Sequence, residues 1–229
     1  MSKIFFSERT KSGDLSTHGA TTRVPLVLCI DASYSMLGRK INAVNTGVQH
    51  FLQEAGSDLY GRDAIEICMI SFGGENAQVI QPFAPVTEAR FQPIRPVGGT
   101  PLGEAVELAI RQLQERFDIY KSMGIPAHRA HLIIMSDGAA DGDTRTALHQ
   151  LRRAEQSIRM DTMCIRLGTD ESGDKVLRDF STTGELMTCD ELNILDFFSW
   201  VSESTIEVSK QVAEEDAWQF GDKGRGRFT

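Results

Sequence analysis

Residues 24–35 read VPLVLCIDASYS and give the clearest indication of the fold. The first part, 24–30, is apolar without a break, which is typical of a parallel strand covered on both faces. Polar residues begin at Asp31, where this strand would leave the sheet. We therefore expect a central strand that ends directly in a polar loop.

Strand-like and helix-like patterns alternate along the rest of the chain. Gly73 and Gly74 indicate a turn, so the apolar runs on either side of them are expected to pair as a hairpin. This alternation predicts an α/β fold with a doubly wound, mostly parallel central sheet, flanked by helices and carrying one short antiparallel edge strand. The predicted helices are 40–55, 102–117, 145–159, 174–180 and 194–208, and the further strands are 64–72, 78–81, 131–136, 161–167 and 185–188.

Composition divides the 229 residues into three segments. The stretch 1–23 is polar and patternless, which predicts a flexible lead-in. The stretch 24–211 holds all the periodic patterns and is long enough to bury a core of its own, so we expect one domain there. The stretch 212–229 ends in glycines and charges and is predicted to be a polar C-terminal tail.

Charge and hydropathy exclude several classes of function. The 24 basic and 32 acidic residues give a net charge of −8, which argues against a general binder of nucleic acid or anionic lipid. No apolar run approaches the ~20 residues of a membrane helix, and the run 4–6 is too short for a secretory signal. The four cysteines lie far apart and are expected to be buried free thiols, so we expect a cytoplasmic protein.

Three polar loops lie where ligands usually bind in such a fold. In an open α/β sheet, ligands bind beyond the carboxyl ends of the strands, where the strand order reverses. The polar residues that follow a strand or precede a helix at this edge are Asp31, Ser33, Ser35, Thr100 and Asp137. All five supply hard oxygen atoms, which suit Mg²⁺ and exclude the nitrogen and sulfur ligands of a zinc site. Mn²⁺ and Ca²⁺ are the other ions expected.

The candidate ligands carry little charge for a divalent ion. Only two of them are carboxylates, so a bound ion would keep positive character and attract an anion. We expect an acidic side chain of a partner protein, Glu or Asp, to complete the coordination.

The same residues match a known family. An Asp-x-Ser-x-Ser loop after a buried strand, a threonine in Gly98-Gly99-Thr100 and an aspartate in Ser136-Asp137-Gly138 resemble the metal-ion-dependent adhesion site of von Willebrand factor A (VWA) domains. The resemblance extends from about residue 24 to about 211 and implies a Rossmann-like fold. It also implies that the serines and the threonine ligate the ion directly and that the aspartates often act through water. One departure is Tyr34, which stands where a small residue, commonly glycine, is usual.

Within that family, the chain looks most like the compact bacterial proteins associated with tellurium resistance, the TerY-like proteins. This resemblance implies a metal-dependent protein interaction module rather than an enzyme. It also implies that the partner is a kinase or a phosphatase of a stress-response or tellurite-resistance system.

Each motif has a structural alternative. Thr100 before Pro101 is a good helix N-cap, and Asp137 before Gly138 is a usual turn. The three motifs together, in the right order and at the right ends of strands and helices, favour the metal site.

Other sites are less well supported. His128 and His131 have the spacing of metal ligands but no third ligand nearby, so a solvated pair is expected. The acidic loop 137–143 lacks the residues of an EF-hand. A phosphatase of the haloacid dehalogenase type, with Asp31 as nucleophile, is the alternative function, but it needs a second aspartate where Ser33 stands.

Overall fold

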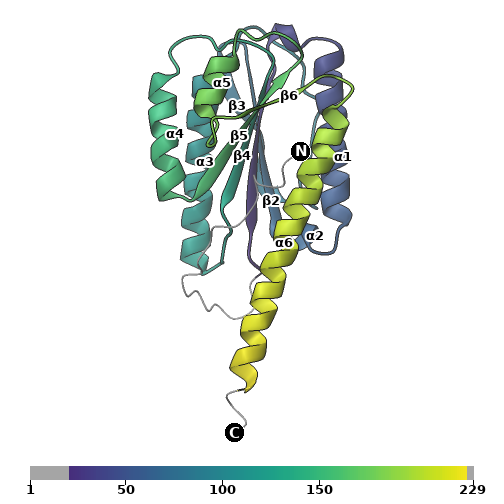
Figure 1. The fold of residues 1–229 in the computed structure, drawn as a ribbon, viewed down its shortest axis with the longest axis vertical. Helices are drawn as coiled ribbons and strands as arrows, with labels where there is room; N and C mark the ends of the chain where they lie inside the picture. Colours follow the sequence, from purple (N-terminus) through teal and green to yellow (C-terminus); the bar gives the residue numbers. More distant parts are fainter. Residues whose placement is uncertain (1–20, 226–229) are drawn as a thin grey trace.

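The computed structural model describes residues 21–225, with side chains as far as 211. Its described part contains one sheet of six strands in the order β3-β2-β1-β4-β5-β6 (Figure 1). All neighbouring strands run parallel except β2 and β3, so the predicted α/β fold with a mostly parallel sheet is confirmed. The strands are β1 (Val24–Asp31), β2 (Ile65–Gly73), β3 (Asn76–Pro85), β4 (Ala130–Ser136), β5 (Met160–Leu167) and β6 (Leu186–Cys189).

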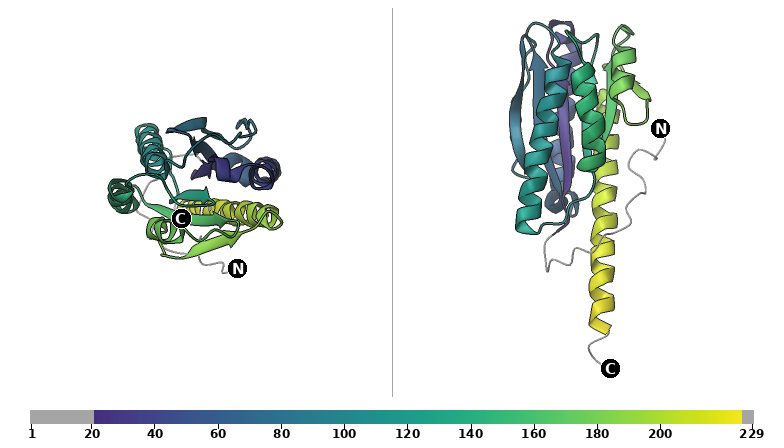
Figure 2. Two further views of the ribbon diagram at one scale, coloured as in Figure 1. Left: turned by 90° about the horizontal axis from the view of Figure 1, so that it is seen from above. Right: turned by 90° about the vertical axis from the view of Figure 1, so that its left-hand side faces the viewer.

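Helices cover both faces of the sheet. One face carries α1, α2 and α6, and the other carries α3, α4 and α5 (Figures 1 and 2). The α-helices are α1 (Arg39–Ser57), α2 (Gly61–Ala64), α3 (Leu102–Met123), α4 (Arg145–Ser157), α5 (Asp174–Phe180) and α6 (Ile194–Arg225). None of the described helices combines the length and the hydropathy needed to cross a membrane.

The central strand β1 is buried along its whole length and divides the core into two clusters. Leu26 and Leu28 pack in the cluster beneath α1 and α6. Val27 and Cys29 point the opposite way, into the cluster beneath α3, α4 and α5. Because side chains alternate along a strand, an unbroken apolar run is required to serve both clusters. All four cysteines are free and buried, as predicted.

Two elements are longer than predicted. The antiparallel edge strand β3 spans Asn76–Pro85 rather than 78–81, and its pairing with β2 contains register shifts. Helix α6 continues to Arg225, into the segment that we assigned to a polar tail, and projects beyond the end of the sheet (Figure 1). The domain boundary at 211 therefore stays a prediction.

The predicted lead-in, 1–23, lies almost wholly outside the described residues. Its last residue, Arg23, is held at the amino-terminal edge of the sheet. The Arg23 amide donates a hydrogen bond to the carbonyl of Pro126, and its guanidinium pairs with the buried Glu66. Arg116 and Tyr120 of α3 also donate to the Glu66 carboxylate. This buried cluster fastens α3 to the sheet at the end opposite the candidate site.

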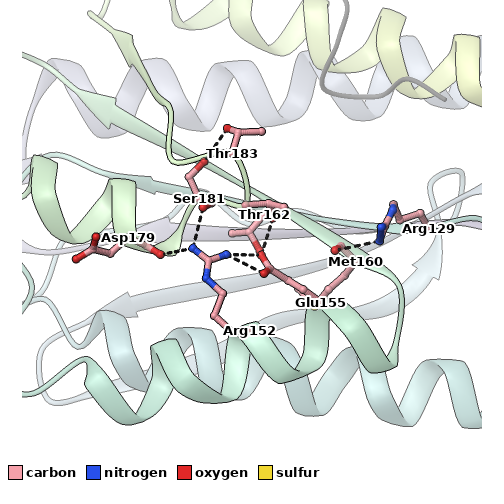
Figure 3. A network of polar contacts seen from close by, with 9 residues as sticks. Arg129, Arg152, Glu155, Met160, Thr162, Asp179, Ser181 and Thr183 are labelled. Carbon is pink, nitrogen blue, oxygen red and sulfur yellow. Dashed lines mark hydrogen bonds and ion pairs between the residues drawn. The ribbon is translucent and has the colours of Figure 1, made fainter. Parts of the chain in front are cut away.

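A second polar network fastens α4 to β5 and to the end of α5 (Figure 3). Arg152 of α4 donates to the carbonyls of Asp179 and Ser181, at the end of α5, and pairs with Glu155. The Glu155 carboxylate accepts a hydrogen bond from Thr182, whose hydroxyl also accepts one from the backbone amide of Thr162 in β5. The network therefore connects α4, the end of α5 and β5.

Candidate metal centre

The strand order places the candidate residues at the switch point of the sheet. The chain leaves β1 toward β2 on one side, and β4 lies on the other side of β1. Asp31 is the last residue of β1, and Asp137 directly follows β4. The crevice between two such strands is the usual ligand site of an open α/β sheet.

The loop after β1 folds around the Asp31 carboxylate. One Asp31 oxygen accepts a hydrogen bond from the Ser33 amide at 2.7 Å, and the other accepts one from the Ser136 hydroxyl at 2.5 Å. The chain then turns through a short 3₁₀ helix, η1 (Tyr34–Met36), which is anchored by the buried Met36.

The two serines of this loop connect it to Asp137. The hydroxyls of Ser33 and Ser35 lie 2.9 Å apart, and the Ser35 hydroxyl donates to Asp137 Oδ1 at 2.6 Å. The structure therefore joins Asp31, Ser33, Ser35 and Asp137 through a continuous set of hydrogen bonds. This convergence is the arrangement that the sequence predicted for these four residues.

Thr100 lies on the adjacent loop, before α3. Its amide donates to Asp141 Oδ2 at 2.6 Å, and the Asp141 amide donates back to the Thr100 carbonyl at 2.9 Å. The N-cap residue of α3 is Pro101, and no side chain caps this helix. The alternative reading of Thr100 as a helix cap is therefore wrong.

Glycines allow the loops to approach one another closely. The Tyr34 amide donates to the carbonyl of Gly98 at 3.0 Å, which links the Thr100 loop to the Asp31 loop. Gly98 has a φ of +55°, and a Cβ atom there would lie 2.5 Å from the Cα of Gly74. A Cβ atom at Gly99 would lie 2.3 Å from Asp141 Oδ2. A side chain at either position would push the loops apart.

Both carboxylates of the site are buried, with exposed fractions of 0% for Asp31 and 1% for Asp137. Burial raises the pKa of Asp31, and the nearby Asp137 raises it further, while hydrogen bonds from Ser136 and Ser33 oppose the shift. A single ammonium contacts this pair in the described structure: Lys40 Nζ lies 2.5 Å from Asp137 Oδ2. Two buried carboxylates facing one ammonium leave a net negative charge, which is an environment that favours a cation.

The donor set fits a hard divalent ion. Five oxygen-bearing side chains lie on three linked loops, and two of them are carboxylates. Asp31, Ser33, Ser35, Thr100 and Asp137 are the residues that would hold such an ion, through their oxygen atoms. The described residues contain no cluster of three or more His, Cys, Asp or Glu side chains placed to hold a metal.

Three residues of the site were not predicted from the sequence: Lys40, Ser136 and Asp141. Lys40 carried a recognisable signal, because a lysine in the first turn of a helix opposes the helix dipole and therefore suggests a local anion. Asp141 carried no such signal. It lies in a polar, glycine-rich loop, and nothing in that sequence indicates that its carboxylate accepts a hydrogen bond from the Thr100 amide, 41 residues away.

Two predictions about individual side chains can be compared with the structure. Tyr34 is 68% exposed and has an ordinary negative φ, so η1 accommodates its ring at the rim of the site without strain. The prediction of a solvated histidine pair is wrong. His131 is only 1% exposed and its ring stacks with that of His128, because β4 is a buried strand along its whole length.

The comparisons with known proteins agree on the fold. The chain resembles the vWF domain of the type V pili tip protein Mfa5 from Porphyromonas gingivalis, at 13% identity and a TM-score of 0.61, over 83% of this chain and 97% of that one. It resembles the pilus adhesin SpaC from Lactobacillus rhamnosus GG in its open conformation, at 14% identity and a TM-score of 0.65, over 85% of this chain and 31% of that one. It also resembles the ArnB paralog VWA2 from Sulfolobus acidocaldarius, at 17% identity and a TM-score of 0.52, over 78% and 44%.

Identities this low show a shared fold and nothing about ligands. No curated protein sequence matches the chain. The sequence model of the von Willebrand factor type A domain matches residues 26–192, from the central strand to the loop before α6. The sheet, its helices and this match lead to one conclusion: the chain belongs to the von Willebrand factor type A domain family.

Proposed function

We propose that this VWA domain binds one divalent cation, Mg²⁺ or alternatively Mn²⁺ or Ca²⁺, through Asp31, Ser33, Ser35, Thr100 and Asp137. The observation that carries the proposal is the hydrogen-bonded link between two buried carboxylates at the switch point, from Asp31 through Ser33 and Ser35 to Asp137. Buried carboxylates are retained where a cation or a hydrogen-bonding partner compensates their charge. A divalent cation between them would compensate the negative charge that Lys40 leaves over.

The bound ion would recruit a partner protein through an acidic side chain. The hydroxyl ligands bring no charge, so a Glu or Asp from outside would complete the neutralisation. Tyr34 and Leu37 stand at the rim with exposed fractions of 68% and 70% and offer apolar contact area around such an anion. VWA domains are typically interaction modules, and the structural relatives include a pilus adhesin and a pili tip protein. The structural relatives therefore support a binding role.

The identity of the partner is a separate proposal. The resemblance to the compact TerY-like proteins supports a cytoplasmic kinase or phosphatase of a bacterial stress-response or tellurite-resistance system. The support is the size of the chain and the character of its loops. Capture of such an enzyme from the native cytoplasm, lost with chelator and regained with Mg²⁺, is the expected result.

Calorimetry of the full-length protein tests the metal site directly. Mg²⁺ or Mn²⁺ should bind to the wild type and not to Asp31→Ala. Thr100→Ala should bind the ion and the captured partner much more weakly, while Thr87→Ala, an exposed threonine further from the site in the same long loop, should behave as wild type. Equal metal affinity of Asp31→Ala and the wild type would show that the site is misassigned.

The alternative is a phosphoryl-transfer enzyme with Asp31 as the nucleophile. Both Asp31 oxygens already accept hydrogen bonds, and Ser33 stands where that chemistry needs an acid. No observation in the structure favours this alternative over the binding role. Turnover of a generic phosphomonoester in the presence of Mg²⁺ distinguishes the two, because the binding role predicts none above background.

A further inference from the structure

Lys40 is the residue of the site that neither the metal nor the acidic partner explains. Its ammonium contacts Asp137 Oδ2 at 2.5 Å and donates to the carbonyl of Ser35 at 3.2 Å. Both contacts are made to residues that we propose as metal ligands. Lys40 therefore presents a positive charge to the same carboxylate that would face the ion.

The surroundings hold Lys40 in this position. Its side chain is 25% exposed, and its stem passes Gly168, where a Cβ atom would lie 3.1 Å from Lys40 Cε. Helix α1 begins at Arg39 and has no acidic residue in its first turn, so its own sequence offers the ammonium no counter-charge there. The Asp137 carboxylate, with a side chain that is 0% exposed, contacts the ammonium and stabilises Lys40 against the helix dipole. The exposed Asp170 carboxylate, in the loop after β5, also attracts Lys40.

The charge balance gives this contact a consequence for the metal. Asp31 and Asp137 together carry two negative charges, and Lys40 neutralises one of them. A divalent ion placed among these groups would be attracted by the carboxylates and repelled by the ammonium at close range, where little solvent screens the repulsion.

We propose that Lys40 is a built-in competitor of the divalent cation, which lowers the metal affinity of the site by occupying Asp137. This inference rests on the proposed metal site and adds its regulation. An acidic side chain from a partner removes the surplus positive charge of ion and ammonium together, so metal and partner bind cooperatively. The isolated domain then holds its ion weakly, and the complex holds it tightly.

Titration of the full-length protein with Mn²⁺ alone tests the competition. Lys40→Gln removes the charge and should bind Mn²⁺ about tenfold more tightly than the wild type, because a close and partly buried repulsion is lost. Arg39→Gln is the matched control: it is the adjacent residue, removes the same charge and is exposed. It should stay within about twofold of the wild type. Lys40→Arg keeps the charge and should keep the wild-type affinity.

Thermal unfolding gives a second, independent measurement. Without metal, Lys40→Gln should melt below the wild type and below Arg39→Gln, because the Asp137 carboxylate is left buried without its cation. Mn²⁺ should raise the Tm of Lys40→Gln more than that of the wild type. Lys40→Met, which keeps the apolar stem, should show the same two effects and covers the case in which the glutamine variant does not fold.

The outcomes separate this inference from the proposed function. A wild type that binds Mn²⁺, with Lys40→Gln indistinguishable from Arg39→Gln, overturns the inference and leaves the metal site standing. Weaker binding by Lys40→Gln and Lys40→Met also overturns it, because Lys40 would then be positioning Asp137 for the ion. A wild type that binds no divalent cation overturns the metal site itself, and the competition with it.

Discussion

The Asp31 carboxylate is held in an environment that does not favour stability. Its side chain is fully buried, and this burial raises its pKa, which means that the folded protein disfavours the ionised form that a metal needs. The hydrogen bonds from Ser33 and Ser136 recover part of that loss. The proposed metal binding at this residue therefore works against the stability of the metal-free fold.

We predict that Asp31→Asn abolishes divalent metal binding and raises the Tm of the metal-free protein. The amide keeps the size of the carboxylate and can still pair with Ser33 and Ser136, but it carries no charge to be desolvated. Calorimetry with Mg²⁺ and thermal unfolding in chelator measure the two effects. A lower Tm for the variant would mean that the ionised carboxylate stabilises the fold, contrary to its environment.

His131 gives the fold a sensitivity to acid. Burial lowers its pKa to about 3, and the neighbouring His128 and Arg129 act in the same direction. Below about pH 6.5 the unfolded chain takes up a proton on this residue that the folded protein refuses until about pH 3. The contribution of His131 to stability is therefore complete above pH 6.5 and is lost as the pH falls through this window.

We predict that the free energy of unfolding decreases by up to ~1.4 kcal/mol per pH unit in this window because of His131. Urea denaturation at a series of pH values measures the slope. His131→Gln should reduce it, whereas His149→Gln, on an exposed position of α4, should leave it unchanged. An unaltered slope in His131→Gln would assign the acid sensitivity to other groups.

At the scale of elements, the long loop between β3 and α3 is held by a side chain of α1. Asn45 donates from its amide to the Ile94 carbonyl at 3.1 Å and accepts from the Ile94 amide at 2.9 Å. The Asn45 side chain thus satisfies both backbone groups of Ile94, as a neighbouring β-strand would. The loop 86–101 carries Thr100, so Asn45 positions the candidate site from a distance.

We predict that Asn45→Ala destabilises the protein by about 1–3 kcal/mol, because both polar groups of the buried Ile94 backbone lose their partner. Trypsin should cut faster after Arg90, and Mg²⁺ affinity should fall as the Thr100 loop loosens. Asn42→Ala, an exposed asparagine of the same helix, is the control. Comparable proteolysis of the two variants would show that the loop is held by its apolar contacts alone.

The elements that could be predicted from the sequence are those with a strong local period. The strand 24–30 is buried on both faces, and an unbroken apolar run shows this. Helix α1 is buried on one face, and apolar residues at helical spacing show that. Strand β3 was predicted too short, since an exposed edge strand interrupted by Pro82 shows neither an apolar run nor regular alternation. Helix α6 was predicted too short, since the sequence beyond Val208 shows no continued apolar stripe to mark its length.

The candidate site also has a part that could be predicted from the sequence and a part that could not. The positions of Asp31 and Asp137 follow from topology, because parallel strands bring their carboxyl ends to one edge. The contact between Lys40 and Asp137 depends instead on the angle at which α1 leaves the first loop. That angle is set by tertiary packing, such as the buried Met36 and Ile41, and no local pattern reports it.

At the scale of the whole molecule, the core that stabilises the fold and the proposed metal site lie in different parts. Two apolar clusters, one on each face of the sheet, hold the domain together. The polar clusters around Glu66 and Arg152 fasten the helices at positions away from the metal loops. The candidate ligands lie at one edge and contribute little to either cluster. The core of an α/β domain of this size forms without an ion.

We therefore predict that chelation leaves the fold intact. The far-UV circular dichroism of the protein should be unchanged in excess EDTA, because no helix or strand depends on the ion. Added Mg²⁺ should raise the Tm only as mass action requires. At a free Mg²⁺ concentration of about a hundred times Kd, the free energy of unfolding should increase by roughly 3 kcal/mol. The rise should vanish in Asp31→Asn, which keeps the core. Unfolding on addition of EDTA would instead identify a structural ion, because the binding energy would then be part of the folding energy, as it is in small metal-dependent domains.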